Sequence, residues 1–495
     1  MPQSKALARN APPLKQAEWN EPTAAKPAPY LGFLTALALC VIIPIWAVLQ
    51  TGDTGYPAWQ WALAATVIAG ARFAWVVASA RRRLFEMTTW LFFYLFLGIA
   101  PLVQLRDRID PGTTLFLAHE YDWQAMGIVI VSEIAIIIGS FFGKSAPGQS
   151  SMKRPQRRVS AIGTRNFSVV LVLVSAAYVV LVGVGTLWDS RAARDIAIAA
   201  VISDPLLNVA VGAIVSFGLL VSVVAQLQVL RERLDGKKPV VLLAVSIVLL
   251  VIIVNPFGSP RFVLMTVALG VLAGFGLFKS VPVFRAIAVG SVAAMLLVFP
   301  LLDTFRRTID ATVEVVDPLA AVKDGDFDSY GQIVNTVWYV TAEGITWGNQ
   351  MLGVLLFWVP RSLWADKPTD TGIMLAEQKG YWFTNLSAPF PTELFINGGW
   401  PAVVLGMLIF GYWLRRWDRR SELHIQLYGV PTLLGCVMPF YLLLLLRGSL
   451  LQAVANVAVI LICWLAVTTR REAPAAEDGI SRRHIPEEAR RRRAR

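Results

Sequence analysis

Several cations stand at short polar breaks between the long apolar runs of this chain. Arg261 occurs in "NPFGSPRF", Arg447 in "LLRGSLL", and Arg361 and Lys367 in "VPRSLWADKP". The planar guanidinium of arginine binds a phosphate group through two parallel hydrogen bonds, and a lysine ammonium adds a point charge. Residues of this kind could bind a diphosphate and stabilise the negative charge that builds on it as a leaving group.

Four further arginines occupy similar places. Arg191 and Arg194 are part of "WDSRAARD", and Arg306 and Arg307 follow the ninth long apolar run. Any of these cations could instead pair with a nearby acid or extend to lipid headgroups. The acids in question are Asp189, Asp195, Asp303, Asp310 and Asp366. The turns "NPFGSPRF" and "LLRGSLL" hold the most specific candidates, because turns this short leave few acids nearby.

Two other residues complete the set of candidates. Glu393, in "SAPFPTELF", could accept the proton of an attacking hydroxyl, or it could be a structural carboxylate that fixes an arginine. Trp364 lies between Arg361 and Lys367 and could stack on a sugar ring, or it could belong to the aromatic belt at a membrane interface. We expect Pro389 and Pro391 to keep this segment extended rather than helical.

The composition indicates a membrane protein. Of the 495 residues 56% are hydrophobic and only 16% are charged, whereas soluble domains have about 25% charged residues. The net charge of +12 is dispersed in short clusters between apolar runs, which argues against nucleic acid as a partner. The three cysteines lie in apolar runs and the three histidines lie far apart. We therefore expect no disulfide framework, no metal site and no cofactor.

Apolar runs long enough to cross a bilayer, about 20 residues each, predict an all-α polytopic membrane protein. The twelve candidate spans are 31–50, 58–79, 85–105, 123–143, 167–188, 207–228, 239–255, 262–278, 283–302, 397–414, 429–446 and 450–468. Two pairs of runs have very short connections, so a count of ten or eleven spans is the alternative.

The distribution of lysine and arginine predicts the orientation. With the N-terminus inside, 32 of these residues fall in inside segments and 12 in outside segments, the bias that multi-pass proteins show. Both termini are then cytoplasmic. The chain divides into a disordered tail (1–29), nine spans (30–302), a long extracytoplasmic loop (303–396), three spans (397–468) and a basic tail (469–495).

The long loop and the spans hold two further predictions. The loop contains the acidic stretch "VKDGDFDSYG" and the run "NQMLGVLLFWVP", which is too short to cross and favours a re-entrant or interfacial helix. Within the spans, Arg72 and Glu133 are ionisable, and we expect them to pair across helices. A proton relay is the alternative for Glu133.

The stretch 357–411 contains "PRSLWADKP" and "SAPFPTELFINGGW", followed by a Gly-rich entry into a span. It resembles the bacterial oligosaccharide repeat-unit polymerases, the Wzy-type or O-antigen polymerase family. The resemblance implies an architecture similar to GT-C enzymes in the cytoplasmic membrane of a bacterium. It also implies a metal-independent glycosyltransferase that uses undecaprenyl-diphosphate-linked oligosaccharides as donor and acceptor and makes a surface polysaccharide such as an exopolysaccharide or capsule.

With that chemistry, we expect Arg361, Glu393 and Arg261 to be catalytic. The residues expected to bind substrate are Arg447, Lys367, Arg306, Arg307, Trp364, Arg191 and Arg194. Expected partners are the lipid-linked glycans, membrane lipids and a chain-length regulator protein.

Three other functions stay open. A ligase of the same architecture would transfer the finished glycan to another acceptor. A transporter or flippase of lipid-linked glycan would show internal repeats and a charged site near the membrane midplane, whereas here the cations gather near one face. A receptor or scaffold would have no need of buried outside arginines.

Overall fold

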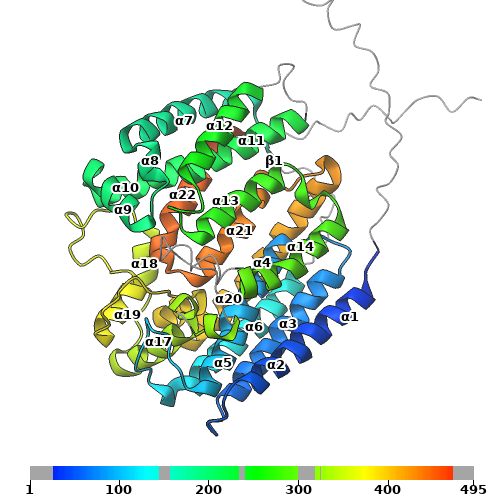
Figure 1. Ribbon diagram of the computed structural model, residues 1–495, viewed down its shortest axis with the longest axis vertical. Coiled ribbons are helices and arrows are strands. Elements are labelled where there is room, and N and C mark those ends of the chain that lie inside the picture. The colour runs from blue at the N-terminus through cyan, green and yellow to red at the C-terminus, as the bar shows by residue number, and fades with distance from the viewer. Residues whose placement is uncertain (1–25, 144–155, 233–239, 299–317, 324, 472–495) are drawn as a thin grey trace, which may run out of the picture.

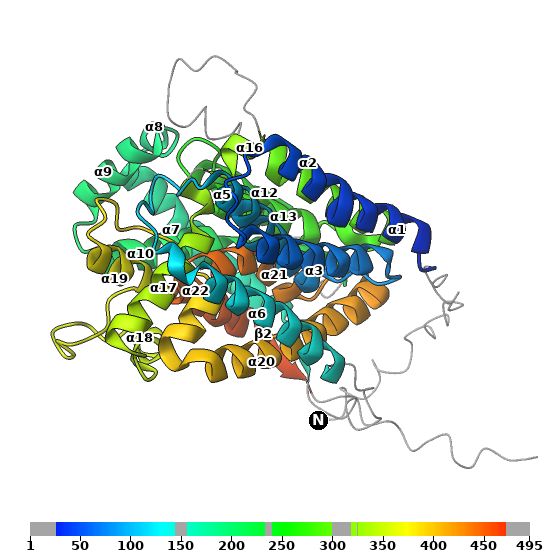
Figure 2. The ribbon, with the colours of Figure 1, turned by 90° about the horizontal axis from the view of Figure 1, so that it is seen from below.

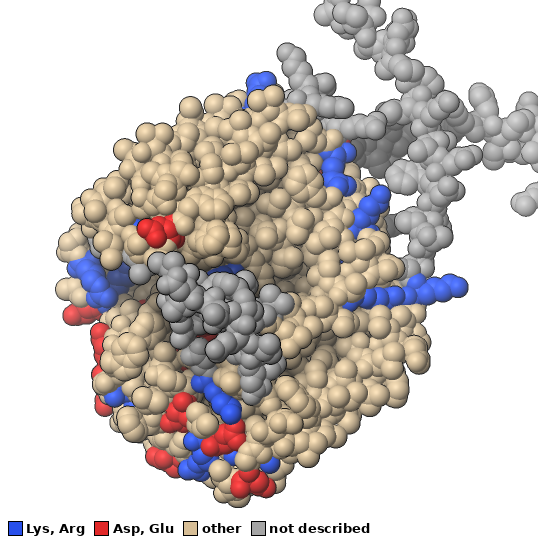
Figure 3. Space-filling view, viewed as in Figure 1, with Lys and Arg blue, Asp and Glu red and all other residues tan. Residues whose placement is uncertain are grey.

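The computed structural model describes residues 26–143, 156–232, 240–298, 318–323 and 325–471. This part of the chain is almost entirely helical, and its apolar helices pack side by side as one bundle (Figures 1 and 2). On the face drawn in Figure 3, carboxylates and cations together mark one end of the bundle, while cations alone mark the other, and a broad uncharged surface separates them. The helices are those of a membrane-embedded all-α protein, as predicted.

Eight helices of the described residues are long and apolar enough to cross a membrane. They are Pro29–Gln50 (α1, η1 and α2), Trp59–Ala78 (α3), Leu84–Asp107 (α4, η2 and α5), His119–Phe142 (η3 and α6), Ala161–Val182 (α7), Leu206–Arg231 (most of α10, η5 and α11), Phe390–Tyr428 (α20) and Leu450–Val467 (α22). Four shorter apolar helices are Val240–Ile253 (α12), Arg261–Gly274 (α13), Val281–Leu297 (α14 and most of η7) and Leu433–Arg447 (α21). Each of the twelve predicted ranges overlaps one of these helices. Since the four shorter helices do not reach the length of about 20 residues that a crossing requires, the count of twelve crossings stays a prediction.

Three of the long helices contain a π-helical segment. These segments are Ala38–Ile42 (η1), Leu95–Ile99 (η2) and Ile214–Gly218 (η5). The first two come just before a proline of the same helix, Pro44 and Pro101 respectively. Because proline has no N–H, it cannot complete the regular ladder of the preceding turn, and a local π-bulge is one way in which a helix adapts.

Helix α20 is longer than the predicted span 397–414. It begins at Phe390, directly after Pro389, and it ends at Tyr428. The expected extended backbone is found at Pro389, which precedes the helix with a ψ of 151°. The expectation is wrong for Pro391, because proline is tolerated in the first turn, where its missing N–H has no partner to lose. The helix is broken at Gly398 and Gly399, and the second of these has a φ of 62°, which favours glycine.

Helix α20 packs closely against α6 (Asp122–Phe142). A Cβ on Gly139 would lie 2.0 Å from the backbone oxygen of Leu408, and one on Gly411 would lie 2.2 Å from that of Ile136. Only glycine permits this approach of the two backbones, which is typical of helix packing within membranes.

The described residues between η7 and α20 form short helices at one end of the bundle. They are α16 (Pro318–Ala321), η8 (Gly325–Phe327), α17 (Ser329–Glu343), α18 (Asn349–Leu355) and α19 (Thr371–Lys379). Helix α18 lies within the run predicted to be re-entrant or interfacial, and it is only seven residues long. It follows a segment that docks on the break in α20, where Thr346 and Gly348 donate their N–H groups to the backbone oxygens of Ile396 (2.8 Å) and Asn397 (3.0 Å).

The remaining elements connect the apolar helices or, in the case of β2, follow the last of them. They are β1 (Gln156–Val159), α8 (Val184–Leu187), α9 (Arg191–Val201), η6 (Leu277–Lys279) and β2 (Thr468–Arg471). Strands β1 and β2 pair in antiparallel fashion, with Arg157 opposite Arg470. The sequence predicted no strand, and it assigned 469–471 to the basic tail. Backbone pairing of two short basic segments has no hydrophobic signature in the sequence.

The predicted pair of Arg72 and Glu133 is not formed. Instead, Nη2 of Arg72 lies 3.3 Å from Oε2 of Glu86 and donates to Oγ of Ser140 at 2.9 Å. Glu133 is fully buried, and its carboxyl oxygens have no hydrogen-bond partner within the described ranges.

Candidate functional site

Two of the predicted arginines meet at the end of the bundle that is predicted to face outward, which we call the outer end. Arg447 is the last residue of α21, and Arg261 is the first residue of α13. Both pair with Asp326 in η8: Arg261 forms an ion pair with its carboxylate, and Nη2 of Arg447 lies 3.7 Å from its Oδ1. Nη2 of Arg447 also lies 3.5 Å from Oδ1 of Asp328. These four residues are named the outer cluster.

The carboxylates of the outer cluster come from the acidic stretch of the long loop. We expected few acids beside Arg261 and Arg447, and that expectation is wrong, because the loop folds back over both turns. Asp328 is 2% exposed and accepts the N–H of Ser387 at 2.9 Å. Its burial raises the pKa of the carboxyl group, against the opposing effect of Arg447. The sequence showed "VKDGDFDSYG" as acidic but not what it would contact.

Glu393 lies next to the outer cluster but is enclosed. It is 1% exposed. Its Oε1 accepts the hydroxyl of Ser449 and the N–H of Leu450, both at 3.0 Å, and its Oε2 accepts the hydroxyl of Thr371 at 2.9 Å. A carboxylate at the N-terminus of α22 is favoured by the helix dipole. This geometry corresponds to the structural alternative for Glu393, since it fixes the turn that carries Arg447.

The segment "VPRSLWADKP" is folded on itself. Nζ of Lys367 donates to the backbone oxygens of Phe357 (2.6 Å) and Val359 (2.9 Å), and Nη1 of Arg361 donates to the backbone oxygen of Lys367 (2.8 Å). Burial and the nearby charge of Arg361 lower the pKa of Lys367. Trp364 is half-buried, and Arg361 is exposed. The hydrogen bonds recorded for these cations thus hold the segment's own backbone and do not join them to the outer cluster.

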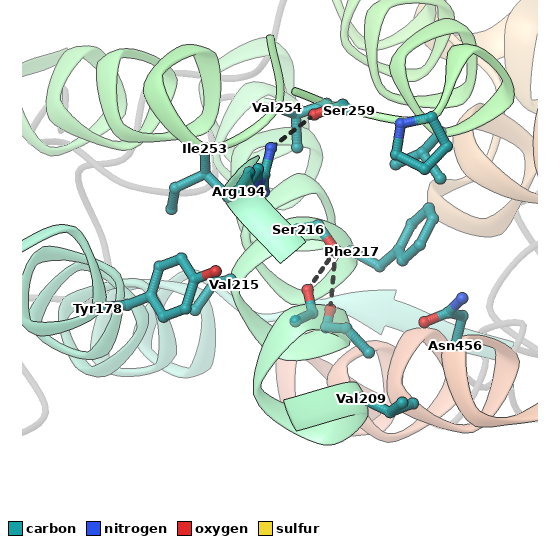
Figure 4. Close-up of a pocket in the computed structure, with 14 residues that line it drawn as sticks. Tyr178, Arg194, Val209, Val215, Ser216, Phe217, Ile253, Val254, Ser259 and Asn456 are labelled. Atoms are coloured by element: carbon teal, nitrogen blue, oxygen red, sulfur yellow. Dashed lines mark hydrogen bonds between the residues drawn. The ribbon is translucent and has the colours of Figure 1, made fainter. Parts of the chain in front are cut away.

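Arg191 and Arg194 in α9 have different surroundings. Nε of Arg191 lies 3.6 Å from Asp195 of the same helix, and both side chains are exposed, which is the acid pairing considered as an alternative. Arg194 lines a pocket of about 210 Å³ together with Tyr178, Ser259 and Asn456 (Figure 4). Its Nη1 donates to Oγ of Ser259 at 3.2 Å.

The pocket and the outer cluster are neighbours along the chain. Ser259 and Pro260 line the pocket, and the next residue is Arg261 of the cluster. The rest of the wall comes from α7, α10, η5, α12, α13 and α22, and it combines apolar side chains with the polar groups of Tyr178, Ser216 and Asn456. A pocket of mixed apolar and polar lining with one guanidinium, beside two further arginines, is chemically suited to a ligand that is part lipid and part anion. Arg306 and Arg307 lie outside the described residues.

Sequence reasoning missed several polar residues at the outer end. Asp326, Asp328, Thr371 and Ser449 bind the predicted arginines or Glu393, as described above. Asp370 begins α19, and burial raises its pKa; its Oδ2 has no hydrogen-bond partner in the described part of the chain. The acidic stretch was a visible signal for the first two residues, and no spacing marked the others.

No family model, no curated protein and no solved structure matches this chain. The function is therefore inferred from the geometry of the outer end and from the residues that form it.

Proposed function

We propose that this protein is a glycosyltransferase that polymerises undecaprenyl-diphosphate-linked oligosaccharide repeat units at the outer face of the cytoplasmic membrane. The observation that carries the proposal is the convergence of Arg261 and Arg447, from two separate helix ends, on Asp326. The resemblance of 357–411 to the repeat-unit polymerases, a count of twelve crossings and an architecture similar to GT-C enzymes belong to the same proposal.

In this reaction a hydroxyl of the acceptor attacks the anomeric carbon of the donor. The new glycosidic bond forms, the bond to the diphosphate oxygen breaks with its electron pair, and the hydroxyl proton passes to a base. The diphosphate gains negative charge as it leaves, and fixed cations stabilise that charge without a metal. Arg261 and Arg447 supply the cations, and the half-exposed carboxylate of Asp326 is the candidate base.

The outer cluster as described is close to charge balance, with two guanidiniums and two carboxylates. An arriving diphosphate competes with Asp326 for both arginines. We infer that Asp326 holds the arginines in place before substrate binds and is displaced from at least one of them afterwards. Arg194 and its pocket would take the adjoining part of the lipid carrier.

Glu393, Arg361 and Lys367 act as positioning residues in this proposal. Glu393 fixes the turn of Arg447 through Ser449, while Arg361 and Lys367 shape the loop through its backbone oxygens. Trp364, between the two cations, keeps a part of its ring accessible to a glycan.

The test uses a strain that lacks the gene and is complemented with the wild type, Arg447→Gln, or Arg108→Gln as the control. Arg108 is an exposed arginine at the same end of the bundle. Surface polysaccharide is separated on a gel, the lipid-linked pool is analysed by mass, and the amount of each variant in the membrane fraction is measured.

We expect single lipid-linked repeat units to accumulate in the deletion strain and with Arg447→Gln, and long chains to return with the wild type and the control. Long lipid-linked chains that stay on the carrier would instead indicate a ligase. Repeat units trapped on the inner face would indicate a flippase, and an unchanged glycan in every strain would refute all three functions.

A further inference from the structure

A second group of arginines lies at the opposite end of the bundle from the outer cluster. Arg72 of α3, Arg83 before α4, and Arg415 of α20 surround the carboxylate of Glu86. The nitrogen-to-oxygen distances are 3.3, 3.3 and 3.5 Å. These four residues are named the inner cluster.

The inner cluster has more donors than acceptors. The side chains of Arg72, Arg83 and Arg415 are only 10%, 7% and 11% exposed, and all three guanidiniums share the single carboxylate of Glu86. The Nε atoms of Arg72 and Arg83 are buried and form no hydrogen bond within the described residues. A buried guanidinium with unused donors is costly unless an acceptor reaches it.

The charges near the inner cluster do not balance. A further acid beside the cluster is Asp418, whose two oxygens accept the N–H groups of Phe85 (2.8 Å) and Glu86 (2.9 Å) at the start of α4. Among the described residues, Asp418 and Glu86 give two carboxylates against the three guanidiniums of the cluster, an excess of one positive charge. Arg82 does not change this count, because Glu422 binds it separately at 2.6 Å. Burial lowers the pKa of Arg83 to about 10, so it stays charged at neutral pH.

The inner cluster also has access to the surface of the bundle. The indole ring of Trp75 lies 3.8 Å from Cζ of Arg72 and 3.6 Å from Cζ of Arg83, and this tryptophan is 37% exposed. Tryptophan is enriched at the level of lipid headgroups. The exposed ring therefore marks a place where a headgroup can approach the two arginines from the side of the bundle.

We propose that the inner cluster is a binding site for a phosphate group, with the phosphodiester of an anionic lipid as the ligand. A phosphate supplies the missing negative charge and several acceptor oxygens, and it fits the planar fork of arginine. The basic segment 80–84 beside the cluster is predicted to lie at the inner face, where anionic lipids are attracted to lysine and arginine. This proposal does not depend on the proposed glycosyltransferase activity.

The test uses the full chain, purified in a neutral maltoside detergent and stripped of lipid. It is titrated with phosphatidylglycerol, with phosphatidylcholine, and with inorganic phosphate, and binding is followed by native mass spectrometry and by thermal unfolding. The variants are Arg83→Gln, Glu86→Gln, and the control Arg81→Gln, an exposed arginine of the same segment.

We expect phosphatidylglycerol to bind and raise the unfolding temperature of the wild type and the control. Arg83→Gln loses one pair of charge-assisted donors, so its affinity for phosphatidylglycerol should fall by about tenfold or more. Glu86→Gln removes the competing carboxylate, so this variant should bind phosphatidylglycerol more tightly, and its unfolding temperature should rise more on adding the lipid. If the cluster were purely structural, Glu86→Gln would be less stable and would gain nothing from the lipid. Stabilisation by inorganic phosphate as well would extend the site to free phosphate.

Equal affinity of the wild type and Arg83→Gln for phosphatidylglycerol would overturn the proposal. So would the absence of any tighter binding in Glu86→Gln. Equal binding of phosphatidylglycerol and phosphatidylcholine in every variant would also overturn it, because the binding would then depend on the acyl chains and not on the charge of the headgroup.

Discussion

Replacement of Glu393 by alanine should strongly destabilise the outer end of the bundle. The change leaves the hydroxyls of Thr371 and Ser449 and the N–H of Leu450 without their acceptor. A buried donor without a partner costs about 1–3 kcal/mol. Three donors correspond to about 3–9 kcal/mol, and we expect the lower end because water can enter the space that the carboxylate leaves. The exposed Glu343 at the end of α17 gives the matched control Glu343→Ala.

The chain carries its own reporter for this measurement. Cys436 and Cys463 are buried and Cys40 is half-buried, and all three are free thiols. A thiol-reactive fluorescent dye will therefore label them mainly when the bundle opens on heating. We expect Glu393→Ala to unfold at a clearly lower temperature than the wild type, and Glu343→Ala to match the wild type. If the free energies of unfolding of both variants lie within about 0.5 kcal/mol of the wild-type value, which is the typical range for surface changes, then Glu393 does not hold the turn of Arg447.

Three further predictions use the same preparation. Gly139→Ala should destabilise by about 1–3 kcal/mol, because its Cβ would lie 2.0 Å from a backbone oxygen of α20, while Gly290→Ala, with open space around it, should not. Asp326→Asn should bind inorganic pyrophosphate about tenfold more tightly, equivalent to about 1.4 kcal/mol, because the competing charge is gone; unchanged affinity by calorimetry would contradict the displacement proposed above. Asp110 has a lowered pKa, since a hydrogen bond with His119 and backbone N–H bonds outweigh the effect of burial. The ionised Asp110 therefore stabilises the fold above its unfolded-state pKa, and this stabilisation is lost as the pH falls through the lower folded-state pKa. In Asp110→Asn the unfolding temperature should therefore fall less steeply than in the wild type when the pH is lowered from about 6 to about 3.

The positions of the apolar helices could be predicted because they depend on local composition. All twelve predicted ranges overlap an apolar helix, since a long apolar run without charges has few other structures available in a membrane. The errors occurred where tertiary contacts decide. The end of α20 lies at Tyr428 because the charged residues beyond 414 find partners such as Arg82 and residues at the start of α4.

The candidate site was predictable by residue type but not by partner. Arg261 and Arg447 were recognised as unusual cations, and the structure brings them together. Their acids could not be assigned, because the loop that carries Asp326 has no periodicity that shows where it folds. Arg361 and Lys367 were grouped with them by charge, by their place beside a short apolar run and by the resemblance, whereas the hydrogen bonds recorded for them go to nearby backbone oxygens.

The break in α20 has a consequence for the order in which this protein is assembled. At Gly398 and Gly399 the helix ladder is interrupted, and the backbone oxygens of Ile396 and Asn397 accept N–H groups from Thr346 and Gly348 instead. In a bilayer an unsatisfied backbone group costs several kcal/mol. Helix α20 therefore cannot reach its final conformation at lipid depth on its own, and the preceding loop must be docked when the helix inserts. Synthesis places that loop just ahead of the helix, so the partner of the break is made before the break itself.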